Sequence, residues 1–128
     1  MNLLLDTHTL IWYLQEDEKL SSNMAKTLED AGNSACVSIV SLWEIAIKLN
    51  LEKISLDIPF SDLPGLLEPL LIRILPVVFT DTENYLRLPL HHRDPFDRMI
   101  VAQAISHSLT IVSIDKALDA HPVQRLWA

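Results

Sequence analysis

The chain has 128 residues, of which 49% are hydrophobic and 21% charged, and its formal net charge is −7. This composition excludes a disordered chain, and we expect one domain that spans residues 1–128. The acidic balance argues against a protein that binds nucleic acid through a global excess of Lys and Arg, although bound divalent cations can reverse the local sign of charge at a carboxylate cluster.

Strands are expected where short apolar or β-branched runs occur, at residues 2–6, 35–39, 75–79, 109–114 and 123–127. Helices are expected at residues 7–14, 21–31, 41–49, 82–88 and 95–107. Prolines divide the segment 54–76 into one or two short helices. This alternation predicts an α/β fold in which a parallel sheet is covered by helices on both faces.

Three features of the sequence indicate the cellular compartment. Cys36 is the single cysteine, which excludes an intrachain disulfide and favours a reducing compartment. The first apolar run has no basic residue before it and ends at Asp6, so we do not expect a signal peptide. The stretch EPLLIRILPVVF is interrupted by Arg73 and Pro76 and is too short to span a bilayer. A cytoplasmic protein without a membrane segment is therefore expected.

Acidic residues are expected to gather at the edge of the sheet where strands end and helices begin, which is where parallel sheets bind ligands. Asp6 ends the first expected strand, and Asp115 follows the fourth strand by one residue. Glu44 is expected in the first turn of the helix after the second strand, and Asp94 and Asp97 open the helix that begins at Pro95. The remaining acids lie in polar surroundings and are interpreted as surface residues.

Each of these acids also has a structural interpretation. Asp94 and Asp97 flank Pro95 in the pattern of a helix N-terminal cap, and Ser41 with Glu44 fits the capping box S-x-x-E. Aspartates that follow strands are also common turn formers. A cap, however, does not require acids from several segments to meet. Like charges brought to one edge are unfavourable unless a cation lies between them.

The metal that such a site would take is a hard cation. Carboxylate oxygens are the ligands preferred by Mg²⁺ and Mn²⁺, whereas Cys36 and the pair His91–His92 do not have the spacing of a zinc site. A divalent cation held by carboxylates suits phosphodiester hydrolysis, because it activates water and stabilises charge on phosphate oxygens. His8, close to Asp6, is interpreted as a local structural group or a group on the substrate side.

Four sequence blocks occur in order: LLLDTHTLIWYL, SIVSLWEIAIKL, HHRDPFDRMIVAQA and LTIVSIDKAL. In residues and spacing they resemble PIN-domain ribonucleases, most closely the VapC-type toxins of prokaryotic toxin–antitoxin pairs, and the resemblance covers essentially the whole chain. It implies a PIN-like α/β/α sandwich with a central, mostly parallel sheet. It also implies dependence on Mg²⁺ or Mn²⁺, a homodimer, and a cognate antitoxin that blocks the site.

Carried over position by position, the acidic site of the family falls on Asp6, Glu44, Asp97 and Asp115. Ser113 stands where the family often has Thr, and it keeps the hydroxyl group. Asp94 belongs to the DPFDR variant of the third block; it either caps the helix, which is the favoured interpretation, or contacts the metal. The basic residues beside these blocks either meet substrate phosphates or are ordinary surface charges; they are Lys48, Arg93, Arg98 and Lys116.

The resulting hypothesis is a Mg²⁺-dependent endoribonuclease. Asp6, Asp97 and Asp115 would hold the cation, while Glu44 would complete the site or orient the attacking water. Because an acidic protein gains little from non-specific phosphate attraction, a selected RNA such as a particular tRNA is the expected substrate.

Alternative functions remain open. An aspartyl-phosphate phosphatase or phosphoacceptor domain would also place an Asp after the first strand, but such phosphatases usually have a second Asp two residues later, where this chain has His8. A catalytically inactive PIN fold that binds proteins is disfavoured because all four family acids are present. Four further residues are expected mostly in the core, with some available to a dimer or antitoxin surface: Trp12, Tyr13, Trp43 and Ile47.

Overall fold

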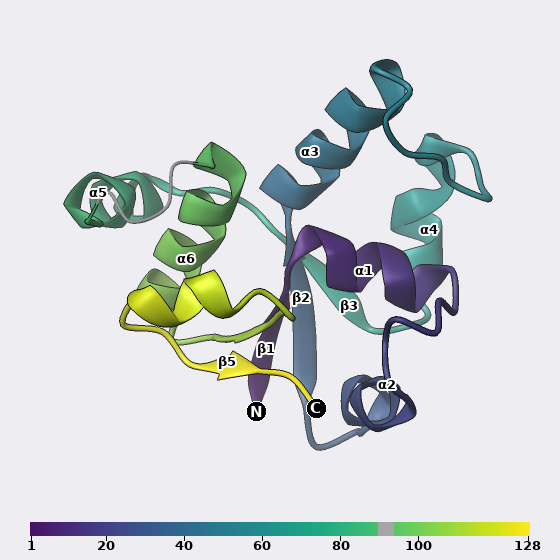
Figure 1. The fold of residues 1–128 in the computed structure, drawn as a ribbon, viewed down its shortest axis with the longest axis horizontal. Helices are drawn as coiled ribbons and strands as arrows, with labels where there is room; N and C mark the ends of the chain where they lie inside the picture. Colours follow the sequence, from purple (N-terminus) through teal and green to yellow (C-terminus); the bar gives the residue numbers. More distant parts are fainter. Residues whose placement is uncertain (90–93) are drawn as a thin grey trace.

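The strands form one five-stranded sheet. In the computed structural model, which describes residues 1–89 and 94–128, the strands are β1 (Asn2–Leu5), β2 (Ser34–Ser38), β3 (Ile72–Leu75), β4 (Thr110–Val112) and β5 (Arg125–Leu126). Their order is β3-β2-β1-β4-β5, and each pair of neighbours is parallel. The first strand of the chain is therefore the central strand of the sheet (Figure 1).

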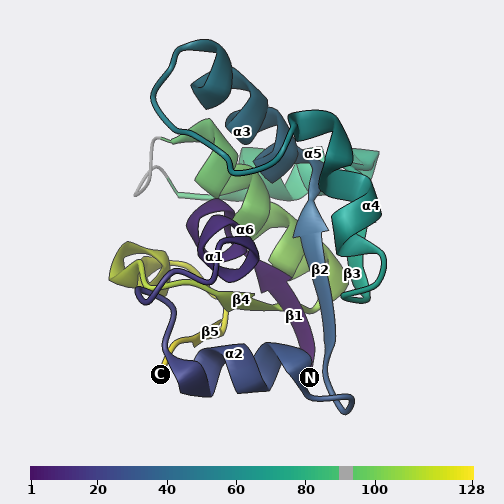
Figure 2. The same cartoon turned by 90° about the vertical axis from the view of Figure 1, so that its right-hand side faces the viewer.

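Helices cover both faces of this sheet (Figures 1 and 2). One face carries α1 (Thr7–Leu14), α2 (Ser22–Glu29), α3 (Ile39–Asn50), the short turn η1 (Phe60–Asp62) and α4 (Leu63–Leu67). The other carries α5 (Phe79–Arg87), α6 (Pro95–His107) and the turn η2 (Lys116–Ala120). The predicted α/β/α sandwich is thus confirmed, with a sheet that is parallel at each pairing.

The central strand explains why the sheet needs a helical layer on both sides. Side chains alternate along a strand, so Leu3 and Leu5 enter the core beneath α1 to α4, while Leu4 enters the core beneath α6. All three leucines are fully buried. An unbroken apolar run is typical of a strand that is covered on both faces.

The expected strand at 75–79 is wrong. The strand is Ile72–Leu75, which pairs with β2 from Ala35↔Ile72 to Ser38↔Leu75. Pro76 has no backbone N–H, which disfavours continuation of the ladder beyond Leu75. The backbone N–H of Val78 donates instead to Asp81 Oδ2 at 2.9 Å, which starts α5 at Phe79.

The expected start of α3 is also wrong. The helix begins at Ile39, and its N-cap is Ser38, whose Oγ accepts a hydrogen bond from Val40 N at 3.0 Å. Ser41 is therefore inside the helix and forms no capping box with Glu44. Glu44 lies in the second turn of α3 rather than in the first.

Within residues 1–89 and 94–128, no helix has both the length and the apolar character needed to cross a bilayer.

Replacing Ile45 by Ala is expected to lower the free energy of unfolding by about 2–5 kcal/mol, because Ile45 is fully buried in α3 and a cavity would remain. Urea unfolding followed by circular dichroism measures this loss. The control is Leu86→Ala on α5, where the side chain is 83% exposed and a change within about 0.5 kcal/mol is expected. Equal losses in the two variants would contradict the assigned core.

Candidate active site

The candidate site lies where β1, β2 and β4 end. The carboxyl ends of β1 and β2 and the N-termini of α3 and α6 lie at the same end of the molecule (Figure 1). The chain moves outward from β1 to β2 and β3 and then returns to place β4 on the other side of β1. Parallel α/β sheets bind ligands at such a reversal of strand order.

Asp6 is held at the end of the central strand. Its side chain is only 8% exposed, and its Oδ1 accepts a hydrogen bond from Thr9 N at 2.9 Å as the N-cap of α1. The Asp6 N–H and the Thr9 hydroxyl both donate to Val112 O, at 3.2 and 3.0 Å. The turn after β1 is thereby tied to β4. Among the described residues nothing donates to the other carboxylate oxygen, Oδ2, which remains available to a ligand.

Glu44 is buried as well, with 5% exposure, and both of its oxygens have partners. The Thr7 hydroxyl donates to Oε1 at 2.7 Å, and Lys48 Nζ lies 2.7 Å from Oε2. The hydroxyl oxygens of Thr7 and Ser41 are 3.0 Å apart. Because the Thr7 proton is directed to the carboxylate, Ser41 is the donor in that contact. This network joins the residue after Asp6 to the second turn of α3.

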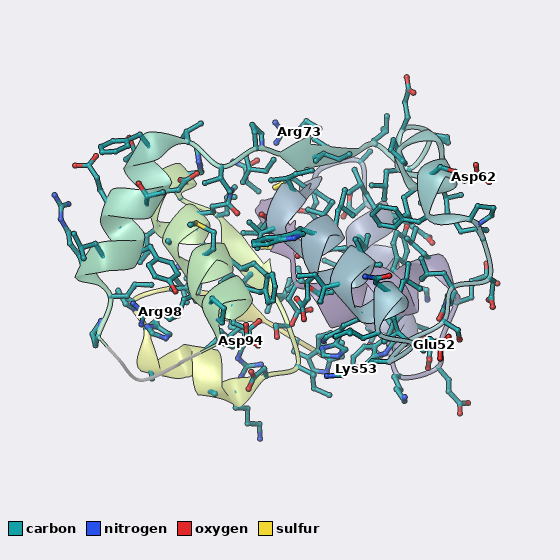
Figure 3. The ribbon with its side chains drawn as sticks, turned by 90° about the horizontal axis from the view of Figure 1, so that it is seen from above. Glu52, Lys53, Asp62, Arg73, Asp94 and Arg98 are labelled. Atoms are coloured by element: carbon teal, nitrogen blue, oxygen red, sulfur yellow. The ribbon has the colours of Figure 1, made fainter. Side chains whose placement is uncertain are left out.

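Asp94 and Asp97 have different positions at the start of α6. Asp94 is the N-cap: its Oδ1 accepts hydrogen bonds from Phe96 N at 2.8 Å and Asp97 N at 3.2 Å. The predicted capping role of Asp94 is therefore confirmed, and Figure 3 shows this residue at the start of α6. Asp97 is half-buried in the first helical turn, where the backbone N–H groups favour a negative charge.

Asp115 and Ser113 follow β4 and contact one another. The Asp115 N–H donates to Ser113 Oγ at 3.0 Å, and Ser113 is fully buried. The Asp115 carboxylate caps η2 by accepting from Ala117 N at 2.9 Å. The hydroxyl at position 113 therefore shapes the turn that presents Asp115.

The four candidate acids thus come from the turn after β1, from α3, from the start of α6 and from the turn after β4. Within the described part of the chain, no three His, Cys, Asp or Glu side chains are close enough together to hold a metal ion on their own. The donor set still fits a hard cation, because it consists of carboxylate oxygens. Mg²⁺ commonly binds through one or two carboxylates and retains several waters, so a compact protein cage is not required.

The basic residues near the acids are largely committed to internal contacts. Arg98 is buried; its guanidinium donates to Tyr85 O and Pro89 O, both at 3.0 Å, and lies 4.6 Å from the centre of the Tyr85 ring. Arg98 therefore fastens α6 to α5 (Figure 3), and this position does not favour contact with a substrate phosphate. Lys48 pairs with Glu44, whereas Lys116 is exposed. The predictions for His91, His92 and Arg93 lie outside the described residues.

The aromatic residues divide between the core and the surface. Trp12 and Tyr13 are partly buried and pack against the core. His8 is exposed, and its ring centroid lies 5.8 Å from that of Trp12. Trp43 is 61% exposed, so it is not a core residue and takes the surface position that the sequence analysis left open for some of these residues. Its ring meets Phe96 edge to face, with centroids 5.3 Å apart.

Sequence reasoning missed Thr7 and Thr9. Both are buried and use their hydroxyl groups to connect the turn after β1 with α3 and with β4. The sequence pattern that could have indicated these two residues is Asp-Thr-His-Thr between two apolar runs. Polar residues that interrupt apolar runs are often buried and then need hydrogen-bond partners.

Comparisons with known proteins indicate the family of the chain. The PIN domain family model matches residues 3–123. Ribonuclease VapC22 of Mycobacterium tuberculosis (strain ATCC 25618 / H37Rv) is 33% identical over 121 residues, which cover 93% of this chain and 91% of that protein.

Solved structures share the fold. The structure of VapBC2 from Rickettsia felis bound to a DNA fragment from their promoter contains a chain that matches with a TM-score of 0.71, 17% identity and 98% coverage of both chains. FitAcB from Neisseria gonorrhoeae matches with a TM-score of 0.60 and 23% identity, covering 97% of this chain and 96% of that one.

Replacing Thr7 by Val is expected to lower the free energy of unfolding by about 1–3 kcal/mol. Valine keeps the shape of the threonine side chain but removes the hydroxyl group that donates a hydrogen bond to buried Glu44. Thermal or urea unfolding provides the measurement. The matched control is Thr82→Val, which removes a hydroxyl bonded to Phe79 O on the exposed surface of α5. A Thr7 variant as stable as the Thr82 variant would show that the buried network contributes nothing.

Proposed function

Because this chain belongs to the PIN domain family and is a relative of the VapC ribonucleases, we propose that it is a metal-dependent endoribonuclease acting as the toxin of a toxin–antitoxin pair. The observation that carries the proposal is a pair of buried carboxylates, Asp6 at the end of β1 and Glu44 in α3, where Glu44 accepts a hydrogen bond from Thr7, the residue that follows Asp6. Both carboxylates lie at the edge where parallel sheets bind ligands, which favours a chemical role for them.

In the proposed site Asp6, Asp97 and Asp115 hold the cation directly or through bound water, and Glu44 completes the site or orients the attacking water. PIN-domain ribonucleases of this type generally depend on a divalent metal ion. Mg²⁺ is the proposed ion, and Mn²⁺ is expected to substitute, since both take carboxylate oxygens. When bound, such an ion supplies activation of water and neutralises charge on the phosphate oxygens.

The protein's own residues orient these groups. The Thr9 N–H holds one oxygen of the Asp6 carboxylate, and the second oxygen would bind the cation. Thr7 and Lys48 hold the two oxygens of Glu44, so this carboxylate keeps one orientation while water is positioned for in-line attack. The N-terminus of α6 favours the ionised form of Asp97.

The proposed partners follow from the family and from charge. VapBC2 and FitAcB are among the proteins whose solved structures share this fold. We propose that this chain has a cognate antitoxin, that it forms a homodimer and that it acts in the cytoplasm. With a net charge of −7, the protein gains little from non-specific phosphate attraction, so a specific tRNA or another structured RNA is the proposed substrate.

Cleavage of a total tRNA pool with Mg²⁺ or Mn²⁺ tests the activity. Asp6→Asn and Asp97→Asn are each expected to lower the cleavage rate by at least about 100-fold. Substitution of residues that only hydrogen-bond to metal ligands already costs about 10–100-fold, and loss of a ligand should cost more. Gel analysis of the RNA and sequencing of the cut ends measure the loss and locate the cut.

The controls separate this activity from contaminating ribonucleases. Asp57→Asn removes an exposed carboxylate in the loop after α3 and is expected to cleave like wild type. EDTA should abolish wild-type cleavage. Equal background in all proteins would contradict the proposed enzyme and favour a catalytically inactive PIN-fold binding module.

Asp94 and Asp97 are expected to respond differently to substitution by Ser. Asp94→Ser keeps a side chain that caps helices well, so stability and RNA cleavage should stay near wild type, whereas Asp94→Ala should lose about 0.5–2 kcal/mol of stability. Asp97→Ser should lose cleavage. Loss of cleavage in a stable Asp94→Ser variant would instead place Asp94 among the metal ligands.

A further inference from the structure

An exposed apolar face lies along α3 beside the candidate site. Trp43, Ala46, Ile47 and Asn50 recur at helical spacing on one side of α3, and with Leu49 and Phe60 they line a cavity of about 600 Å³. A second cavity of about 390 Å³ adjoins it and shares Trp43, Ala46 and Phe60. We call the surface formed by Trp43, Ala46, Ile47, Asn50 and Phe60 the Trp43 face.

The Trp43 face lies beside the two helix segments that carry Glu44 and Asp97. Trp43 directly precedes Glu44 in α3, and Phe96 directly precedes Asp97 in α6. The two rings meet edge to face at 5.3 Å with an interplanar angle of 75°. This contact joins the beginnings of α3 and α6 and leaves 61% of Trp43 exposed. An aromatic surface therefore adjoins the place where a phosphodiester would be cut.

The cavities at the Trp43 face are lined by uncharged residues in an otherwise acidic protein. No described residue that lines either cavity carries a carboxylate. A cavity of about 660 Å³ formed by the C-terminal part of α1, by α2 and by α4 is different, because Glu16, Asp17, Glu18 and Glu29 line it. RNA phosphates would be repelled at that acidic cavity but not at the Trp43 face.

We propose that Trp43 stacks an unpaired base of the RNA substrate next to the phosphate that is cut, an inference that rests on the proposed function. Proteins recognise single-stranded RNA by stacking unpaired bases on aromatic side chains and by hydrogen bonds to base edges. The exposed indole provides the stacking surface, and the Asn50 amide at the same cavity provides donors and an acceptor for a base edge. Nucleotides flanking the cut phosphate must lie beside Glu44 and Asp97, which favours a nucleotide over a protein segment at this position.

The test measures binding of a single-stranded RNA hexamer that contains 2-aminopurine, a base whose fluorescence is quenched on stacking. Binding is measured in the Asp97→Asn background so that the probe stays intact. Trp43→Leu is expected to weaken binding about 10-fold, within the range that stacking of one base provides, and to abolish the quenching. Trp43→Phe should retain most of both. The matched control is Phe79→Leu, which alters a 78% exposed aromatic on α5 that lines neither cavity and should change nothing.

Other outcomes overturn the inference. These are an unchanged affinity and quenching in Trp43→Leu, or no hexamer binding up to about 100 µM, the weak end of non-specific binding. A third such outcome comes from light scattering. If Trp43→Leu converts a dimer into a monomer, the Trp43 face is a contact between protein chains and does not bind an RNA base. Cleavage of the tRNA pool by protein with intact Asp97 is scored separately. Stacking without cleavage would refute the proposed function and leave Trp43 only as a residue that binds RNA bases, whereas cleavage without stacking would refute this inference alone.

Discussion

The hydrogen bond from Thr7 to Glu44 is the interaction on which the arrangement of the site depends. Thr7 directly follows Asp6, so its position is determined by the end of β1, the central strand of the sheet. Because its hydroxyl donates to a carboxylate in the second turn of α3, the helix after β2 is fixed relative to β1. Donation to a charged acceptor in a buried position is stronger than a neutral hydrogen bond, and leaving that acceptor unpaired would be unfavourable.

The turns that carry the candidate acids also cap the helices that follow them. Asp6 caps α1 and Asp115 caps η2, in each case with Oδ1 as the acceptor. Asp94 caps α6 and thereby orders the turn that carries Asp97. A carboxylate has more acceptor positions than one backbone N–H occupies, so a residue can stabilise a helix start and still face a ligand. The structural and chemical interpretations of these acids are therefore compatible.

The second helical layer holds the start of α6 in place. Arg98 donates to the backbone of Tyr85 and Pro89, and buried Asp81 lies 3.1 Å from His107 Nε2 at the other end of α6. These contacts join α5 to both ends of α6. Since Phe96 meets Trp43 at the start of the same helix, the position of α6 also determines the shape of the Trp43 face.

The sequence by itself determined the alternation of strands and helices, the sandwich, and the helices at Thr7–Leu14 and Pro95–His107, because these depend on local periodicity and on Pro and Asp at helix starts. It also indicated which acids follow the strands. Only the tertiary structure decided that Ser38 rather than Ser41 caps α3 and that Ile72–Leu75 is the edge strand beside β2. It likewise decided that Arg98 turns inward while Trp43 remains exposed. Such outcomes depend on which distant segment supplies a donor, an acceptor or a packing surface, and local pattern does not encode that choice.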